Sequence, residues 1–242
     1  FKKKIIVICI SNSLKIYYAN NFKFLKNNTN LFYLHDGSDD LLNKNLAFKQ
    51  KTNHNNNFNI GYFGSLYSGR GIELIIDISL RLPSYTFHIF GGSKNEILQY
   101  KSYKNKNLIF HGFVPPYQAE KLMLDMDCLI APFQNKVSVF GNKGDTSKWM
   151  SPLKIFNYMA SKKPIVASRI IVLKEVLKDK YNCIFCDPQD VDDWVRAINL
   201  IRKDINFRNA IANNAYYDFK NKYSWNLRAK NIKDIILNYE KI

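Results

Sequence analysis

The chain contains 242 residues, enough for one large domain or two modest ones, and 46% of them are hydrophobic, as in soluble globular proteins. No run of about 18 apolar residues occurs, which excludes an ordinary membrane-spanning helix. The formal net charge of +16 favours anionic partners. The lysines are spread along the chain without a dense basic block, so we expect a solvated basic surface. Peripheral contact with an anionic membrane is the next interpretation, and no nucleic-acid partner is expected.

The N-terminal part, residues 1–45, reads as strand, helix and strand. An apolar run at residues 5–10 is followed by Ser11 and Ser13, either of which can cap a helix. A second apolar run at residues 31–34 ends in a turn. The start is too short and wrongly flanked for a signal peptide. We therefore expect the chain to begin inside a larger protein.

Residues 46–59 are polar and rich in asparagine, and they show no periodic apolar pattern. Such a composition is typical of an interdomain linker. We expect His54, which lies within it, to be exposed to solvent.

The next predicted strand, residues 58–64, leads into a glycine-bearing loop. Arg70 and Gly71 end this loop, and a helix is predicted from residue 72 to about residue 82. A loop of this kind lets the backbone approach a phosphate, and an arginine can bind phosphate oxygens with two hydrogen bonds. The loop is therefore a candidate phosphate site.

Strands and helices continue to alternate as far as residue 133. The spacing predicts strands at 86–90, 108–114 and 127–133 and helices around 96–103 and 117–126. His88 and His111 lie in or next to these strands. We interpret His88 as a histidine of the core or the sheet, and His111 as a core histidine, with a position facing the cleft as the alternative.

A polar loop, residues 134–149, leads to the segment around which the second half of the chain is organised. Ser151 is a good N-cap and Pro152 suits the first helical position. Apolar side chains follow at helical spacing until Pro164 ends the helix, and residues 165–167 form a short buried strand. The start of such a helix is a ready site for a phosphate or a sugar hydroxyl.

Four cysteines occur, at positions 9, 128, 183 and 186. The pair Cys183 and Cys186 has the spacing of some metal and redox sites, but no second pair of Cys or His lies at zinc spacing. We interpret these two as buried strand thiols. Nothing suggests a disulfide scaffold, so a reducing cytoplasm is expected.

The remaining pattern predicts helices at 191–201, 209–220 and 226–239, with Trp194 packed in the core. Strands that alternate with helices at this spacing imply an α/β fold with a doubly wound parallel sheet and a ligand at the carboxyl ends of its strands. No Gly-x-Gly-x-x-Gly follows the first strand of this sheet, which disfavours an NAD-type domain.

Two motifs carry a resemblance to a known family. Residues 151–160 read Ser-Pro-Leu-Lys-Ile-Phe-Asn-Tyr-Met-Ala, and residues 163–168 read Lys-Pro-Ile-Val-Ala-Ser. Together they resemble the donor-site signature of retaining GT-B glycosyltransferases, above all family 4 (glycosyl transferases group 1). The resemblance implies a Rossmann-like C-terminal half of a GT-B enzyme at residues 60–225. It also implies that the N-terminal βαβ segment is the end of an acceptor-side domain. The last helix, 226–242, would pack back on that segment.

The resemblance also assigns site residues. In the family the loop before the first helix carries a basic residue on the diphosphate, which Arg70 matches, whereas the earlier basic position is Ser65 here. A helix glutamate that binds the ribose is replaced by Asn157, and a second glutamate by Trp149. The residues implied at the nucleotide-sugar site are Gly64, Ser65, Arg70, Gly112, Phe113, Val114, Ser151, Pro152, Leu153, Lys154 and Asn157.

The function implied is the transfer of a sugar, with retention, from a nucleotide-diphosphate sugar to a glycan or lipid-linked acceptor, without a metal or other cofactor. Arg70, Lys154 and the helix start would neutralise the departing diphosphate, and Asp145 is a candidate for a contact with the sugar. The setting implied is polysaccharide assembly in the cytoplasm, with peripheral contact at the inner face of the membrane. Two alternatives stay open: a non-catalytic nucleotide-sugar-binding subunit, and an epimerase of sugar nucleotides.

Overall fold

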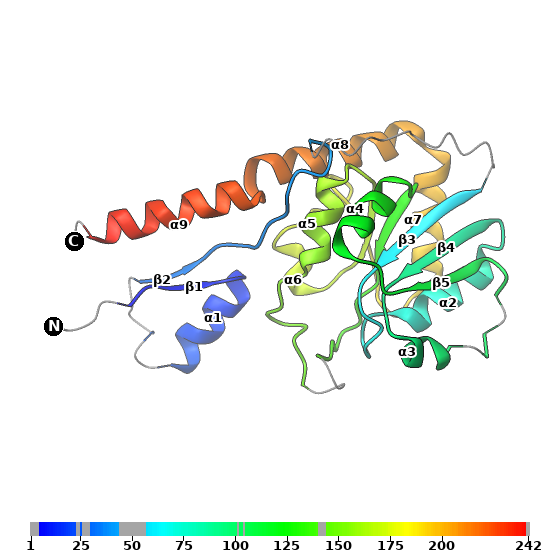
Figure 1. The fold of residues 1–242 in the computed structure, drawn as a ribbon, viewed down its shortest axis with the longest axis horizontal. Helices are drawn as coiled ribbons and strands as arrows, with labels where there is room; N and C mark the ends of the chain where they lie inside the picture. Colours follow the sequence, from blue (N-terminus) through cyan, green and yellow to red (C-terminus); the bar gives the residue numbers. More distant parts are fainter. Residues whose placement is uncertain are drawn as a thin grey trace.

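The computed structural model describes residues 5–22, 25, 30–43, 57–100, 102–103, 105–139 and 144–240. It contains a small N-terminal unit and a larger α/β domain, and a long C-terminal helix extends from the domain along the unit (Figure 1). Of the predicted linker, residues 46–56 and with them His54 lie outside the described residues, so that boundary stays a prediction.

The N-terminal unit consists of β1 (Val7–Cys9), α1 (Asn12–Asn21) and β2 (Leu31–Tyr33). The two strands pair in parallel, with Val7 opposite Leu31. This confirms the predicted βαβ segment. A small cluster of buried side chains, Cys9, Leu25 and Leu31, holds the unit together.

The α/β domain contains a parallel sheet in the order β5-β4-β3-β6-β7-β8. Its strands are β3 (Phe58–Phe63), β4 (Tyr85–Phe90), β5 (Leu108–Gly112), β6 (Cys128–Ala131), β7 (Ile165–Ser168) and β8 (Ile184–Cys186). The chain winds outward from β3 in one direction and then from β6 in the other, so the switch point lies between these two strands. The arrowheads of β3, β4 and β5 point toward the side where the N-terminal unit lies (Figure 1). The predicted fold class is confirmed.

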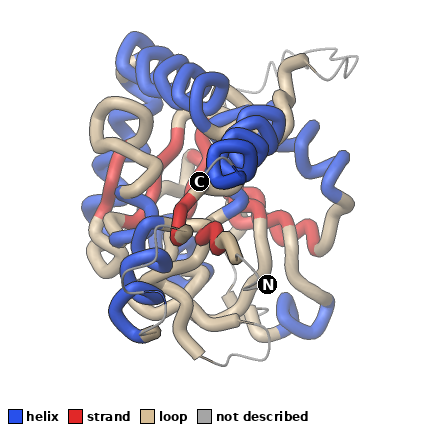
Figure 2. The backbone as a smooth tube through the Cα atoms, turned by 90° about the vertical axis from the view of Figure 1, so that its left-hand side faces the viewer, coloured by secondary structure: helices blue, strands red, loops and turns tan. Residues whose placement is uncertain are grey.

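Helices cover both faces of this sheet, as the end-on view shows (Figure 2). The helices of the domain are α2 (Ile72–Arg81), α3 (Lys94–Leu98), α4 (Pro116–Leu124), α5 (Leu153–Ala160), α6 (Ile171–Lys174), α7 (Val191–Lys203) and α8 (Ile205–Lys222). The last helix, α9 (Trp225–Glu240), extends away from the sheet along the N-terminal unit (Figure 1). α8 begins earlier than predicted because Asp204 ends α7 and at the same time caps α8 by accepting from Phe207 N.

Alternate side chains of the strands enter two separate cores. Phe63 and Leu129 belong to the core under α4, α5 and α8, whereas Ile60 and Ile130 belong to the core under α2 and α7. In the central strands β6 and β7 every residue is buried, so these strands read as continuous runs, whereas β5 at the edge alternates between partly buried and exposed residues. Trp194 is fully buried in the second core, as predicted.

The unit and the domain are joined where the segment after β2 crosses the start of α9. Ser38 N donates to Tyr223 O at 3.0 Å and Trp225 N donates to Ser38 O at 3.2 Å. The Arg228 guanidinium lies 3.4 Å from the Asp36 carboxylate. The start of α9 is thus fastened to the N-terminal unit.

The histidine prediction is half wrong. His88 is partly buried in β4, but His111 is exposed on β5, because β5 is the edge strand and a register irregularity in its pairing with β4 places His111 outside the paired positions. The two rings meet at 3.0 Å between His88 Nδ1 and His111 Nε2. Cys183 and Cys186 are buried free thiols, as predicted.

No helix in the described part of the chain is both long and apolar enough to cross a membrane.

Candidate functional site

A cavity of about 520 Å³ opens at the carboxyl ends of β3, β4 and β5. It is lined by Phe63, Gly64, Ser65, Tyr67, Phe90, Gly91, Gly92, Ser93, Glu96, Phe113, Val114 and Ala119. The rings of Phe63 and Phe90 stack with centroids 4.6 Å apart and form an aromatic wall. The size, the aromatic lining and the position at the carboxyl ends of parallel strands are typical of a site for a small planar ligand.

Four of the residues expected at the site line this cavity: Gly64, Ser65, Phe113 and Val114. Phe113 is 76% exposed, so its ring is available to a ligand. Gly112 comes directly before it, and its carbonyl already accepts a hydrogen bond from Gly91 N at 2.7 Å. The loops after β3 and β5 therefore meet in this cavity.

Lys154, in the first turn of α5, reaches the start of the glycine loop. A Cβ atom placed on Gly64 would lie 2.7 Å from Lys154 Nζ. The ammonium lies 3.9 Å from the centroid of the Tyr62 ring and 4.9 Å from that of Phe133. Burial, and to a smaller extent the charge of Arg70, lowers the pKa of Lys154 well below its usual value. Lys154 thus brings a cation to the place where the sequence has Ser65 instead of a basic residue.

Arg70 also lies next to the Phe133 ring. Its guanidinium carbon lies 5.4 Å from the centroid of the Phe133 ring. Gly71 permits this path, because its φ of 80° is left-handed and a Cβ there would lie 1.9 Å from the Pro132 carbonyl oxygen. The loop is therefore held against the segment after β6 by a close backbone contact.

Three polar atoms in this region are buried without a hydrogen-bond partner: Arg70 Nε, Ser151 Oγ and Lys154 Nζ. Within the described residues, no carboxylate forms an ion pair with either cation. Buried cations without a partner carry a large desolvation cost, which a bound anion removes. The arrangement is therefore suited to an anion such as a diphosphate.

The predicted cap of α5 is wrong by one residue. The helix begins at Leu153, and Pro152 occupies the N-cap position without a side-chain cap. Pro152 has φ −81° and ψ 81°, which is outside the helical region. Ser151 therefore lies before the helix, and its hydroxyl is left without a partner. Leu153, at the first helical position, is half exposed.

Asn157 lies one turn further along α5 and faces the segment that follows β2. Its Oδ1 accepts a hydrogen bond from Ser38 Oγ at 2.7 Å. Its amide nitrogen has no hydrogen-bond partner among the described residues and remains available as a donor.

Asp145 stands apart from these residues. Its Oδ1 accepts from Val137 N at 3.0 Å and from Ser147 N at 2.9 Å, and these hydrogen bonds lower its pKa. It lines a separate polar cavity with Ser68 and Lys136 rather than the aromatic-lined one. The structure thus does not bring Asp145 into contact with Lys154.

Tyr62 and Phe133, whose rings lie next to the two basic side chains, are not predicted as site residues from the sequence. Both occur in or directly after apolar strand runs, and nothing in the local sequence separates them from ordinary core residues. The Tyr62 hydroxyl donates to Ser65 O at 2.7 Å, which fixes the first turn of the loop. Among the described residues no group of three or more His, Cys, Asp or Glu side chains is arranged to hold a metal.

Several solved structures have a fold similar to that of this chain. Anabaena HepE, solved with UDP and glucose, has a TM-score of 0.71 at 18% identity, over 96% of this chain and 62% of that protein. Sucrose-phosphate synthase of Thermosynechococcus elongatus has a TM-score of 0.73 at 15% identity, over 98% of this chain and 58% of that protein. At such identities the similarity concerns the GT-B fold.

A curated relative is an uncharacterized glycosyltransferase of Methanocaldococcus jannaschii, 26% identical over 240 residues. The alignment covers 93% of this chain and 57% of the relative, so the chain spans little more than half of that protein. The family model described as "Glycosyl transferases group 1" matches residues 43–218, which contain the aromatic-lined cavity and both buried cations. The chain belongs to the glycosyl transferases group 1 family.

Proposed function

We propose that this chain is the donor-binding part of a retaining glycosyltransferase of family 4. It transfers a sugar, of hexose type, from a nucleotide-diphosphate sugar to a glycan or a lipid-linked saccharide. The setting is polysaccharide assembly in the cytoplasm, with peripheral contact at the inner face of the membrane, to which the net charge of +16 would contribute.

The observation that carries the proposal is a pair of basic side chains beside an aromatic-lined cavity, each with a buried nitrogen that has no hydrogen-bond partner in the described part of the chain. The Arg70 guanidinium carbon and Lys154 Nζ lie 5.4 Å and 4.9 Å from the Phe133 ring centroid. Arg70 Nε and Lys154 Nζ lack hydrogen-bond partners among the described residues. Gly64 lines the cavity and lies next to the Lys154 ammonium. A nucleotide diphosphate has the matching form: a planar base for the cavity and a diphosphate for the cations. UDP and UDP-glucose bound by Anabaena HepE are ligands of this class.

In the reaction, negative charge develops on the departing diphosphate. Arg70 can bind its oxygens through two nitrogens, and Lys154 supplies a second positive charge. Both are placed before the ligand arrives, so little reorganisation is needed as the charge grows. We propose that these two side chains, with the N–H groups at the start of α5 and the Ser151 hydroxyl, make a metal or another cofactor unnecessary.

A thermal-shift panel with UDP, GDP and ADP tests the proposal. We expect one nucleotide to raise the melting temperature, by the free energy that binding adds to the folded state, and the rise to be absent in Arg70→Ala. Arg81→Ala is the matched control, because Arg81 lies in the last turn of α2 and pairs with Asp192 at the surface. A shift that is equal in Arg70→Ala, or no shift with any nucleotide, would overturn the proposed donor site.

A second candidate is a nucleotide-sugar-binding subunit without transfer activity. Asn157 favours it, because the amide oxygen that would face the ligand is already bonded to Ser38. Asp145 favours it as well, because its carboxylate is bonded within its own loop. Release of labelled sugar from the bound donor distinguishes the two: a transferase releases or transfers it, and a binding subunit returns the donor intact.

A further inference from the structure

One carboxylate of the α/β domain reaches into the N-terminal unit. Glu175, directly after α6, accepts hydrogen bonds from Asn12 N at 2.7 Å and Ser13 N at 2.9 Å, and also from the Ser13 hydroxyl. These groups are 162 or 163 residues apart in the chain. The Glu175 side chain is only 13% exposed, so the contact is shielded from solvent.

The contact completes the start of α1. A helix leaves its first N–H groups without partners within the helix. Ser11 caps the N–H of Leu14, and among the described residues the N–H groups of Asn12 and Ser13 have Glu175 as their acceptor. The first turn of α1 contains no acidic residue of its own. An anion at a helix start is stabilised by the helix dipole. Glu175, which belongs to the α/β domain, therefore supplies the negative charge that the first turn of α1 lacks.

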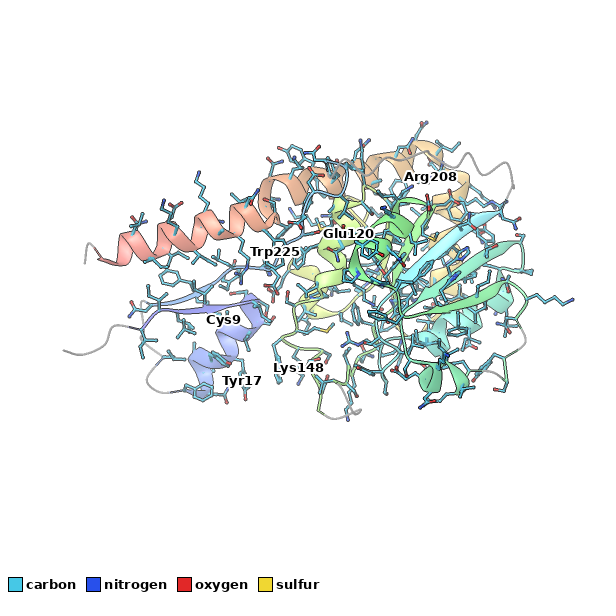
Figure 3. All side chains as sticks on the ribbon, viewed as in Figure 1. Cys9, Tyr17, Glu120, Lys148, Arg208 and Trp225 are labelled. Atoms are coloured by element: carbon cyan, nitrogen blue, oxygen red, sulfur yellow. The ribbon has the colours of Figure 1, made fainter. Side chains whose placement is uncertain are left out.

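A second contact places the same helix start next to the proposed donor site. Ser11 Oγ donates to the carbonyl of Trp149 at 3.1 Å, and the Tyr17 ring lies 4.9 Å from the Trp149 ring. Figure 3 labels Tyr17 on α1 and Lys148 on the loop before α5, and the two segments lie side by side. Trp149 is followed closely by Ser151, whose hydroxyl has no partner. The loop that leads into α5 is therefore held by α1 as well.

His35 also lies close to this carboxylate. Its Nε2 lies 3.7 Å from Glu175 Oε2, and burial lowers the pKa of His35 in spite of the attraction to Glu175. His35 is therefore neutral at pH 7, and the backbone and hydroxyl groups of α1 are the donors that hold Glu175. The fixed orientation of these donors makes the contact directional.

We propose that Glu175 is a positioning residue, which holds α1 of the acceptor-side unit against the donor site while the sugar is transferred. This inference rests on the proposed function, because a fixed distance between the two parts matters when a donor and an acceptor must meet. Glu175 itself does not touch the donor. It acts through α1 and through the loop at Trp149.

Two measurements on the whole chain without nucleotide test the contact. The first is hydrogen exchange at the amides of Asn12 and Ser13. The second is the distance between spin labels on Ile16→Cys and Leu80→Cys, which are exposed positions, while the native cysteines of the described residues are buried. We expect Glu175→Ala to speed exchange at both amides and to broaden the distance distribution. Glu175→Gln, which keeps an acceptor oxygen, should give a smaller change.

A third measurement separates positioning from a general loss of structure. With the nucleotide that the thermal-shift panel identifies, Glu175→Ala should bind with unchanged affinity while release of labelled sugar falls about 10- to 100-fold, as expected when reacting groups are misplaced by about 1 Å. Asp192→Asn, which removes an exposed carboxylate on α7, is the control for all three measurements. The inference would be overturned if amide exchange rates and spin-label distances in Glu175→Ala equal those of the parent protein. It would also be overturned if nucleotide affinity falls by the same factor as the release of labelled sugar. If no nucleotide binds, the proposed function fails, and the first two measurements still decide the contact.

Discussion

Asn157 Oδ1 accepts a hydrogen bond from Ser38 Oγ at 2.7 Å, and this bond joins α5 to the segment that links the N-terminal unit to the start of α9. Ser38 is itself fixed by backbone hydrogen bonds with Tyr223 and Trp225. The position at which the family resemblance implies a ribose contact is therefore also a connection between the two parts of the molecule. Its amide nitrogen, rather than its oxygen, is available to a ligand.

Replacing Asn157 by glutamate should raise nucleotide affinity. A carboxylate has two oxygens, so one can keep the bond from Ser38 while the other accepts from a ribose hydroxyl. Hydrogen bonds to charged groups contribute about 1 kcal/mol more than neutral ones, which corresponds to roughly a fivefold change in affinity. Calorimetry with the nucleotide that the thermal-shift panel identifies measures this change in affinity. Ser38→Ala controls for the loss of the Ser38 bond alone, and equal or weaker binding by Asn157→Glu would contradict the prediction.

Replacing Lys154 by methionine should stabilise the free protein and abolish nucleotide binding. The ammonium is buried without a partner, and its lowered pKa means that the unfolded chain binds the proton more tightly than the folded one. Lys154 therefore destabilises the fold at pH 7, and methionine of similar length removes that cost, with a gain on the order of 1 kcal/mol. Urea unfolding gives the change in free energy, and the thermal-shift panel gives the loss of binding. A less stable variant that still binds nucleotide would show that Lys154 has a structural role instead.

The fold should lose stability as the pH falls from 7.5 to 5.5. Burial lowers the pKa values of His35 and His88, so each takes up a proton more readily in the unfolded chain than in the folded one. Stability from these groups is present above the unfolded histidine pKa of about 6.5 and is lost as the pH falls toward the lowered folded values. Melting temperatures across this range measure the effect, and His35→Gln should reduce the slope. A melting temperature that is higher at pH 5.5 would contradict the assignment.

Gly71→Ala should destabilise the protein more than Gly144→Ala. Both glycines have a left-handed φ, of 80° and 66°, so the conformational strain is shared. A Cβ on Gly71 would collide with the Pro132 carbonyl, whereas nothing lies within 4 Å of the corresponding position on Gly144. We expect a cost on the order of 1–3 kcal/mol beyond that of the control, together with weaker nucleotide binding because Arg70 is displaced. Urea unfolding measures the change in stability, and calorimetry measures the change in nucleotide affinity. An equal loss of unfolding free energy in the two variants would contradict a tight contact between the loop and Pro132.

The sequence by itself determined the succession of elements. Apolar runs bounded by glycine and proline marked β3 to β8, and helical spacing marked α2, α5 and α7. The reason is local: burial on both faces requires continuous apolar strands, and that signal is strong over a few residues. The motif around Lys154 and the glycine loop around Arg70 were also visible, because each is a contiguous stretch of chain.

Only the tertiary structure decided which of these residues meet. Lys154 reaches Gly64 across the switch point of the sheet, Asp145 turns into its own loop, and Asn157 bonds to Ser38 119 residues away. Glu175 reads in the sequence as an ordinary helix residue, yet it completes the first turn of α1. These contacts depend on how the strands are ordered and how the two parts are docked, and neither is encoded in the spacing of residues along a single segment.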